Sequence, residues 1–191
     1  MARPPEFDRG KALNKALALF WRKGYQATSL SDLLAAMDLG RSSFYAAFTD
    51  KRTLYVECMD LFAARMMEHL ERARDEKPPI DVLRSFLERN FVGARDVRPD
   101  WGCMLVNSVL EMAGVDEDLV SHASAHLTTL QRFFRTCLRD AGATPAQADE
   151  LAAMLMLFNE GIRVSSRRRL PGAQQLRTID ATFRLIGNAI G

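Results

Sequence analysis

Apolar residues recur at intervals of three and four positions along most of this chain, and few stretches alternate between apolar and polar residues. The first spacing marks one face of an α-helix, whereas alternation would indicate a half-buried strand. Leu13, Leu17 and Phe20 form the first apolar stripe, which ends before Gly24. Glycine adopts at little cost the left-handed conformation that often ends a helix. The pattern therefore predicts an all-α protein whose first helix ends near residue 24.

Two short helices follow the first one. Thr28 and Ser29 offer hydroxyl groups that can cap a helix over residues 30–37, and Asp32 is favourably placed near its N-terminus. After a turn at residues 38–40, the pattern predicts a third helix over residues 41–48. A helix of about ten residues, a turn of three or four and a second short helix have the dimensions of a helix-turn-helix. We therefore predict this motif over residues 28–48.

The rest of the chain predicts longer helices. A fourth helix, capped by Thr49 or Asp50, runs to about residue 76, and two prolines at 78 and 79 end it. The clearest later start is residues 144–147, where Thr144 and Gln147 fit a capping box. Further breaks divide the remainder into about five helices, and they fall at residues 98–100, 113–115, 142–143 and 170–172. About nine helices are expected in total.

Composition narrows the class of protein. With 191 residues, 48% of them hydrophobic, the chain is long enough for a real core. The formal net charge is only +2, but residues 1–55 contain nine basic and five acidic side chains, and the remainder contains seventeen and nineteen. This asymmetry suggests that the N-terminal part meets a polyanion, although such a charge is also ordinary for a solvated surface.

Cysteine usage and hydropathy indicate the compartment. Cys58, Cys103 and Cys137 are odd in number and form no CxxC pair, which argues against a disulfide framework or a structural zinc site. Residues 1–6 lack the apolar core of a signal peptide, and no apolar run approaches the roughly 18 residues that span a membrane. We expect a cytoplasmic protein with no membrane contact.

The third predicted helix carries the chemistry of the motif. Leu39, Phe44 and Phe48 can face the core, which leaves hydrogen-bonding side chains on the other faces, namely Arg41, Ser42, Ser43, Tyr45 and Thr49. Arginine can bond bidentately to guanine, and serine can contact bases or phosphates at short range. The alternative is a three-helix bundle whose arginine and serines are simply solvated.

Four segments decide between these interpretations: residues 20–30 (FWRKGYQATSL), 33–37 (LLAAM), 42–48 (SSFYAAF) and 51–54 (KRTL). Together they resemble the DNA-binding domain of the TetR (tetracycline-repressor) family. The resemblance covers roughly residues 9–56. It implies a helix-turn-helix DNA-binding domain over residues 1–55 and a helical ligand-sensing and dimerisation domain over residues 56–191.

The same resemblance implies partners and site residues. It implies a homodimer that binds double-stranded operator DNA, usually as a repressor, and that a small-molecule effector releases. Arg41, Ser42 and Ser43 match the family's positions that reach base edges. Thr28, Tyr45 and Lys51 match positions that contact phosphates.

The chain also departs from the family pattern. Asp38 replaces a frequent turn glycine, and two alanines, 46 and 47, replace a frequent histidine or aromatic pair. Gly40 stands where a capping serine or threonine is common, which weakens the cap by about a few tenths of a kcal/mol. Because the alanines shorten the reach of the third helix, Arg41 is expected to carry more of the base discrimination.

Candidates for the effector site come from the second domain, where the family has a cavity. Asn107 and Glu111 interrupt an apolar helix that we expect to begin at Trp101, and their spacing places both on one face. A buried polar pair could bind a ligand, but the pair could equally form a solvated edge. Trp101, Phe158 and Arg163 are further candidates, although phenylalanine at helical spacing is more often plain core.

Cys103 offers a different sensing chemistry. A thiol near a helix N-terminus is more reactive, and some regulators of this family sense oxidants or electrophiles through cysteine. The alternative function is therefore a thiol-based repressor of the same fold. A cysteine in an apolar helix is, however, more often inert packing.

Metal binding and catalysis are not predicted. His122 and His126 lie four residues apart, a spacing at which two imidazoles can share a metal, but the intervening residues lack the glutamate of a zinc hydrolase. Basic residues 167–169 are interpreted as the solvated end of a helix. The sequence contains no nucleophile–base pair, carboxylate dyad or cofactor fingerprint, so we predict no enzyme and no cofactor. A helical adaptor that dimerises without binding DNA is the remaining alternative.

Two stripes near the C-terminus predict the dimer interface. Their apolar residues alternate steps of three and four, as in helices that pack against one another. By resemblance they match the pair of helices that forms a four-helix interface in the family. The predicted interface residues are Leu151, Leu155, Ile162, Leu176, Ile179, Phe183 and Ile186.

Overall fold

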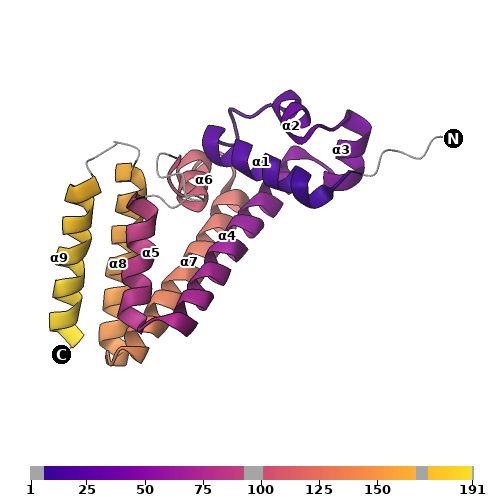
Figure 1. The fold of residues 1–191 in the computed structure, drawn as a ribbon. Helices are drawn as coiled ribbons and strands as arrows, with labels where there is room; N and C mark the ends of the chain where they lie inside the picture. The colour runs from indigo at the N-terminus through magenta and orange to yellow at the C-terminus, as the bar shows by residue number, and fades with distance from the viewer. Residues whose placement is uncertain (1–6, 93–100, 167–171, 191) are drawn as a thin grey trace.

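The computed structural model describes residues 7–92, 101–166 and 172–190, and within these ranges it is built of helices without strands. The prediction of an all-α fold is confirmed. Three short helices form one end of the molecule, two long helices lead away from them, and three roughly parallel helices form the other end (Figure 1). Among the described residues, no helix combines the length and the apolar character needed to cross a bilayer.

The N-terminal end contains the predicted helix-turn-helix. Its helices are α1 (Arg9–Lys23), α2 (Leu30–Met37) and α3 (Arg41–Phe48). The other helices are α4 (Lys51–Glu76), α5 (Pro79–Val92), α6 (Met104–Met112), α7 (Glu117–Asp140), α8 (Pro145–Ser166) and α9 (Gly172–Ile190). In Figure 1, α4 and α7 lie side by side as the long helices, and α6 lies beside α1 near the ends of α4 and α7 that face the helix-turn-helix.

Side-chain caps explain where these helices begin. Ser29 Oγ accepts from the Asp32 amide, and the Asp32 carboxylate accepts in return from the Ser29 amide, which completes a capping box at α2. Asp50 caps α4 by accepting from the Thr53 amide at 2.7 Å. The predicted capping box at α8 is also present, because the Thr144 amide donates to Gln147 Oε1 at 2.9 Å. Short-range sequence signals therefore set these three starts.

One predicted helix start differs from the structure, and two predicted features fall outside the described residues. The helix expected to begin at Trp101 begins instead at Met104, with Cys103 as its N-cap. Gly102 has φ +72°, a left-handed conformation that is incompatible with a continuous helix from Trp101. The predicted break at residues 98–100 and the basic run at 167–169 lie outside the described residues.

A first hydrophobic core joins the DNA-binding helices to the start of the long helices. It contains α1 to α3, the first half of α4, all of α6 and the beginning of α7. At its centre the hydroxyls of Tyr55 and Ser108 share a hydrogen bond of 2.6 Å, both of them buried. Helix α6, which follows α5 in the chain, thus packs against α7, α4 and α1 in the first core rather than against the far end.

A second core holds the far end together. It contains the second half of α4 from Leu70 onward, α5, the second half of α7, α8 and α9. Arg84 of α5 bonds to Asp180 of α9, and its guanidinium lies 5.1 Å from the Phe183 ring centroid. Helix α9 is therefore anchored mainly on α5, and α4 and α7 connect the two cores.

Candidate DNA-binding interface and sensor region

Helix α3 is fixed by its two phenylalanines. Phe44 and Phe48 are one turn apart, almost fully buried, and their ring centroids lie 5.9 Å from each other. Arg9 of α1 holds the end of α3, because its guanidinium lies 4.6 Å from the Phe48 centroid and donates to the Ala47 carbonyl. The apolar face thus determines which side of α3 is turned to solvent.

The solvent-facing side of α3 is the one predicted to read DNA. Arg41 and Ser42 are exposed, Tyr45 is 50% exposed, and Ser43 is half-buried. A short helix that projects a guanidinium fork and hydroxyls from a rigid surface has the chemistry that reads base edges in the major groove. The structure brings these four predicted residues together on one surface, and their roles on DNA remain predictions.

The turn before α3 tolerates the two departures from the family pattern. Asp38 adopts a left-handed conformation with φ +59° and ψ +50°, which aspartate accepts more readily than most residues. Gly40 occupies the N-cap of α3 and, without a side chain, provides no capping hydrogen bond. The motif therefore forms with a less favourable turn and a weaker cap than a glycine and a serine would provide.

The structure corrects the placement of Thr28. Its side chain is fully buried, and its hydroxyl donates to the Gly24 carbonyl at 2.6 Å, so it is not available to a phosphate. Ser29, the next residue, is exposed at the N-terminus of α2. The signal that distinguishes the two is Asp32, which lies three residues after Ser29 and forms the capping box with it.

Lys51 lies against the loop between α1 and α2. Its ammonium is 4.2 Å from the Tyr25 ring centroid, in a cation–π contact. Partial burial lowers the pKa of Lys51, and the negative charges of Glu111 and Asp32 act in the opposite direction. Lys51 is thus held at the first turn of α4, close to the helix-turn-helix, instead of extending freely.

Glu111 binds the same loop and does not line an enclosed cavity. Its carboxylate accepts from the backbone amides of Tyr25 and Gln26, at 2.9 and 2.7 Å. Gln26 returns a bond from its side chain to the Glu111 carbonyl at 3.3 Å. Gly24 leaves room for this contact, because a Cβ there would lie 2.8 Å from Glu111 Oε2. Glu111 therefore ties α6 to the loop that precedes α2, a role that spacing along the sequence did not reveal.

The other predicted effector residues do not share one cavity. Asn107 donates to the Trp101 carbonyl at 2.8 Å and, with Glu111, borders a hollow of about 300 Å³ beside the end of α1. Phe158 borders a separate groove of about 340 Å³ between α8 and α9. Cys103 and Arg163 are both buried in the interior. Trp101 is half-buried, and its ring centroid lies 5.4 Å from that of Trp21 of α1. The six predicted residues therefore do not meet in one cavity.

The interior site contains a polar pair on α8. Asn159 is 1% exposed and Arg163 is 6% exposed, and the two lie one turn apart. Asn159 Oδ1 accepts no hydrogen bond from any described residue. The Arg163 guanidinium lies 5.8 Å from the Phe86 ring centroid, and burial lowers its pKa while nearby Cys103 opposes this effect. Sequence analysis named Arg163 but missed Asn159, whose position four residues earlier on an apolar helix was the available signal.

The three cysteines are all buried. Burial raises the pKa of the Cys58 thiol strongly and that of Cys137 to about 11, so both stay protonated near neutral pH. Cys103 occupies the N-cap of α6 and is 2% exposed. Only Cys103 combines a helix N-terminus with a neighbouring guanidinium, that of Arg163.

Most of the predicted dimer residues belong to the core of a single protomer, which corrects the prediction for them. Five of them are buried in the second core, namely Leu155, Ile162, Ile179, Phe183 and Ile186, while Leu151 and Leu176 are half-buried. The exposed apolar residues of α8 and α9 lie on other faces, at Met154, Leu157, Val164 and Leu185. Spacing identified apolar stripes correctly but not which stripe remains exposed, because both helices are apolar on more than one face.

Comparison with known proteins agrees with this architecture. Residues 12–58 match the family described as bacterial regulatory proteins, tetR family, and residues 79–180 match the C-terminal domain described as transcriptional regulator LmrA/YxaF-like. The chain is 30% identical to the HTH-type transcriptional repressor ComR of Escherichia coli, over 96% of this chain and 90% of that protein.

Solved structures extend the comparison. A cysteine mutant of the TetR family transcriptional regulator CifR, complexed with 26-base-pair double-strand operator DNA, superposes with a TM-score of 0.80. It is 27% identical and covers 95% of this chain and 98% of its own. A TetR family regulator from Cytophaga hutchinsonii, 18% identical, has the same fold with a TM-score of 0.79 over 96% and 97% of the two chains. The exposed face of α3, the two matched domains and these relatives together place the chain in the TetR family of DNA-binding transcriptional regulators.

Proposed function

We propose that this regulator is a repressor whose dimer leaves its operator when a small polar effector enters the interior beside α8. The buried pair Asn159 and Arg163 carries this proposal. An amide oxygen without a donor in an otherwise apolar interior is costly, and a ligand that donates a hydrogen bond would satisfy it. The proposed effector is therefore a small polar molecule with a hydrogen-bond donor, bound between α5, α6 and α8.

At the DNA end, we infer direct base contacts from Arg41, Ser42 and Ser43. We assign phosphate contacts to exposed Tyr45 of α3, to Lys51 at the first turn of α4, and to exposed Ser29 in place of Thr28. ComR is named a repressor, and CifR has been captured on operator DNA. For a dimer of this kind, the two α3 helices would enter successive major grooves about 34 to 36 Å apart. This division of labour keeps the DNA function within residues 1–55 and the sensing and dimer functions within residues 56–191.

The dimer surface that we propose is the exposed stripe of α8. Met154, Leu157, Gly161 and Val164 follow one another at steps of three, four and three, which is the spacing of a helix–helix interface. Met154, Leu157 and Val164 are each more than 40% exposed, and Leu185 of α9, at 67%, adds a second helix to this surface. A second copy of the chain would cover these apolar side chains in a four-helix arrangement.

Helix α6 supplies a route between the two ends. Cys103, at its N-cap, interacts electrostatically with buried Arg163, and Glu111, at its last turn, accepts hydrogen bonds from the loop before α2. A ligand that displaces Arg163 would shift the start of α6, and Glu111 would transmit the shift to the helix-turn-helix. By linkage, operator DNA must then weaken effector binding by the same factor as the effector weakens DNA binding.

Operator binding, with and without candidate effectors, tests this proposal. Selection of bound sequences from random duplexes identifies the operator, and fluorescence anisotropy measures its affinity with and without candidate effectors. Asn159→Ala is expected to weaken release by the true effector while operator affinity without effector stays unchanged. Asn107→Ala, in the hollow beside α1, is the matched control and should respond like the wild type. Full release of Asn159→Ala would contradict the proposed effector site, and failure to select any sequence would contradict the DNA-binding function itself.

A second candidate is thiol-based sensing at Cys103, supported by its position at the N-terminus of α6 close to Arg163. In that case Cys103→Ser abolishes release by peroxide or an electrophile and leaves release by the polar effector intact. Cys137→Ser is the control, because burial raises the pKa of that thiol to about 11. Unchanged peroxide sensitivity in Cys103→Ser would eliminate this mechanism.

A further inference from the structure

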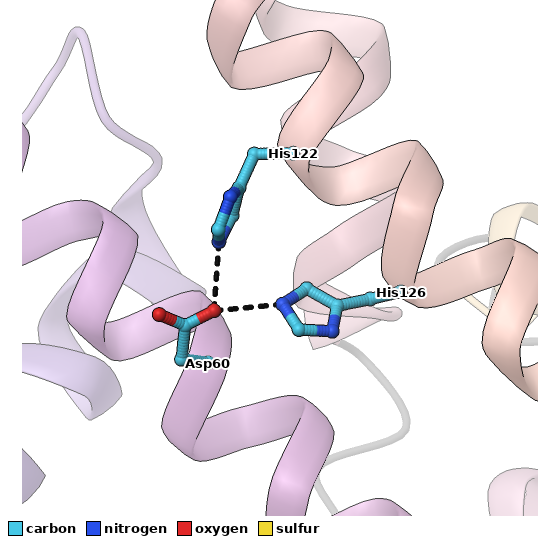
Figure 2. A group of neighbouring side chains, drawn as sticks. All are labelled: Asp60, His122 and His126. Carbon is cyan, nitrogen blue, oxygen red and sulfur yellow. Dashed lines mark hydrogen bonds and ion pairs between the residues drawn. The ribbon is translucent and has the colours of Figure 1, made fainter.

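Two histidines of α7 converge on one aspartate of α4. His122 Nε2 and His126 Nε2 lie 2.7 and 2.8 Å from the same atom, Asp60 Oδ1 (Figure 2). The two imidazole centroids are 5.1 Å apart with an interplanar angle of 83°, so the rings approach the carboxylate from different sides. Sequence spacing pointed only to the two histidines, because Asp60 is more than sixty residues away along the chain. It meets them through the packing of α4 against α7.

We propose that Asp60, His122 and His126 form a binding site for a divalent transition metal ion of the zinc class. Two imidazole nitrogens and one carboxylate oxygen are a donor set that suits Zn²⁺ and its neighbours, whereas Mg²⁺ and Ca²⁺ prefer oxygen donors alone. The ligand atoms of the three residues all lie within 4.8 Å of one another.

The approach of these donors requires only a small adjustment. Zinc bonds to nitrogen and oxygen of about 2.0 to 2.2 Å place tetrahedral donors about 3.4 Å apart. The present nitrogen–oxygen distances of 2.7 and 2.8 Å are those of hydrogen bonds, so an ion would separate each nitrogen from the oxygen by about 0.6 Å. Rotation of the three side chains provides this, because none of them is buried. A histidine Nε2 that now donates to Asp60 must lose its proton to bind the ion. In a neutral imidazole the proton moves to Nδ1, and an imidazolium releases one proton to water.

The site is open enough for a complete coordination shell. The side chains of His122, His126 and Asp60 are 34%, 26% and 50% exposed. Water can therefore occupy the fourth position of the ion, an arrangement that resembles three-ligand zinc sites. The ion would bridge α4, which starts at the helix-turn-helix, and α7. The ion pair between Arg52 and Asp116 already joins these two helices two turns nearer the DNA-binding end.

Binding of Zn²⁺ to the untagged, metal-free, full-length protein tests the site directly. Isothermal titration calorimetry should show one ion per chain, and Co²⁺ as a substitute should produce the visible absorption of a low-coordinate site with nitrogen ligands. Because the ion joins two helices of the folded state only, Zn²⁺ should also raise Tm, and the increase should grow with the logarithm of the free Zn²⁺ concentration above Kd. Absence of saturable binding at one ion per chain would overturn the proposal.

Three variants and one control locate the ion. His122→Ala and His126→Ala should each weaken Zn²⁺ binding by at least about tenfold, since even residues that only support metal ligands are worth that much. Asp60→Asn preserves an acceptor for both histidines but removes the charge, so it should keep the fold and lose affinity. His69→Ala removes the third histidine of the chain, which is hydrogen-bonded to Arg89, and should bind Zn²⁺ like the wild type.

The alternative is a purely structural hydrogen-bonded clamp. In that case the Asp60 and histidine variants lower Tm without Zn²⁺, and the wild type and His69→Ala bind no ion. Equal loss of binding in His69→Ala and His126→Ala would likewise contradict the assignment to this cluster. Circular dichroism of each variant establishes that the fold is retained before its affinity is compared.

Discussion

The two ends of this regulator are opposite in polarity. At the DNA-binding end, α3 buries Phe44 and Phe48 and turns Arg41 and Ser42 to solvent. At the far end, α8 buries Asn159 and Arg163, while apolar residues such as Leu157 are exposed. A surface that meets a phosphate backbone in water needs exposed polar groups, whereas a surface that meets another copy needs exposed apolar ones and an effector site needs buried polar ones. The inversion supports the proposed separation of DNA binding at one end from effector binding and dimerisation at the other.

Charge substitutions on α9 test this contrast with the largest expected effect. Ile179→Asp places a carboxylate in the second core, where it is fully buried, and should lower the free energy of unfolding by at least about 4 kcal/mol. Leu185→Asp, on the exposed face of the same helix, should leave a folded protomer but weaken the dimer. Denaturant unfolding and sedimentation measure the two effects separately.

The same variants can contradict the placement of Ile179 in the core and of Leu185 on the dimer surface. A folded dimer of Ile179→Asp would show that α9 is not anchored as described. Leu110→Asp on α6, an exposed apolar residue at 67%, is the control and should remain a dimer.

Two glycines test the connection between the ends. Gly24 and Gly114 both have left-handed backbones, with φ +86° and +74°, but only Gly24 faces Glu111. Gly24→Ala should therefore cost about 2 to 4 kcal/mol of stability, combining backbone strain with loss of the Glu111 contacts. Gly114→Ala, which meets nothing within 4 Å, should cost only the strain, about 1 to 2 kcal/mol.

If the two glycine variants are equally destabilised, the contact between Glu111 and the loop contributes little. Glu111→Ala in operator titrations then distinguishes a structural from a relaying role. If Glu111 relays the signal, Glu111→Ala should change the effector concentration needed for operator release while the Tm of the protein stays unchanged.

Arg41 and Lys51 separate reading from positioning at the DNA-binding end. Arg41→Ala should reduce discrimination at one or two base pairs by about 1 to 3 kcal/mol. Lys51→Ala should weaken binding to all DNA sequences alike. It should also reduce the slope of log K against log salt concentration by about one unit. Equal losses on operator and random DNA for both variants would refute the assigned roles.

Acid titration tests the junction of α4 and α7. The Arg52 guanidinium, donating to Asp116, lowers the pKa of that carboxyl to about 2. Because this pKa is below that of an unfolded aspartate, about 3.9, the contribution to stability is fully present above pH 4 and is lost as the pH falls toward 2. Arg52→Gln should return the Asp116 pKa, followed by NMR, most of the way to its ordinary value.

The smallest expected effect concerns the weak cap of α3. A Cβ at Gly40 meets no atom within 4 Å, and its backbone already has the extended conformation of an N-cap. Gly40→Ser should therefore add a capping hydrogen bond and raise stability by about a few tenths of a kcal/mol. A lower Tm in this variant would show that the turn before α3 requires glycine for another reason.

Local sequence signals determined much of this protein. The spacing of Phe44 and Phe48, the capping box of Ser29 with Asp32 and the cap at Asp50 each act within a few residues, so the helix-turn-helix and its exposed face follow from the sequence directly. The family resemblance rests on the same short segments. Such features need no knowledge of distant residues, since the interactions that cause them lie within one or two helical turns.

Other features were decided by tertiary packing. Ile179 and Leu185 have the same apolar character, and the packing of α9 against α5 and α8 determines that one is core and the other surface. Glu111 meets Tyr25, and Asp60 meets His122, across 86 and 62 residues of chain. The physical reason is that a helix with several apolar or polar faces can be oriented in more than one way. Its orientation is set by contacts with helices far away in the sequence, and these contacts determine which side chains can act together.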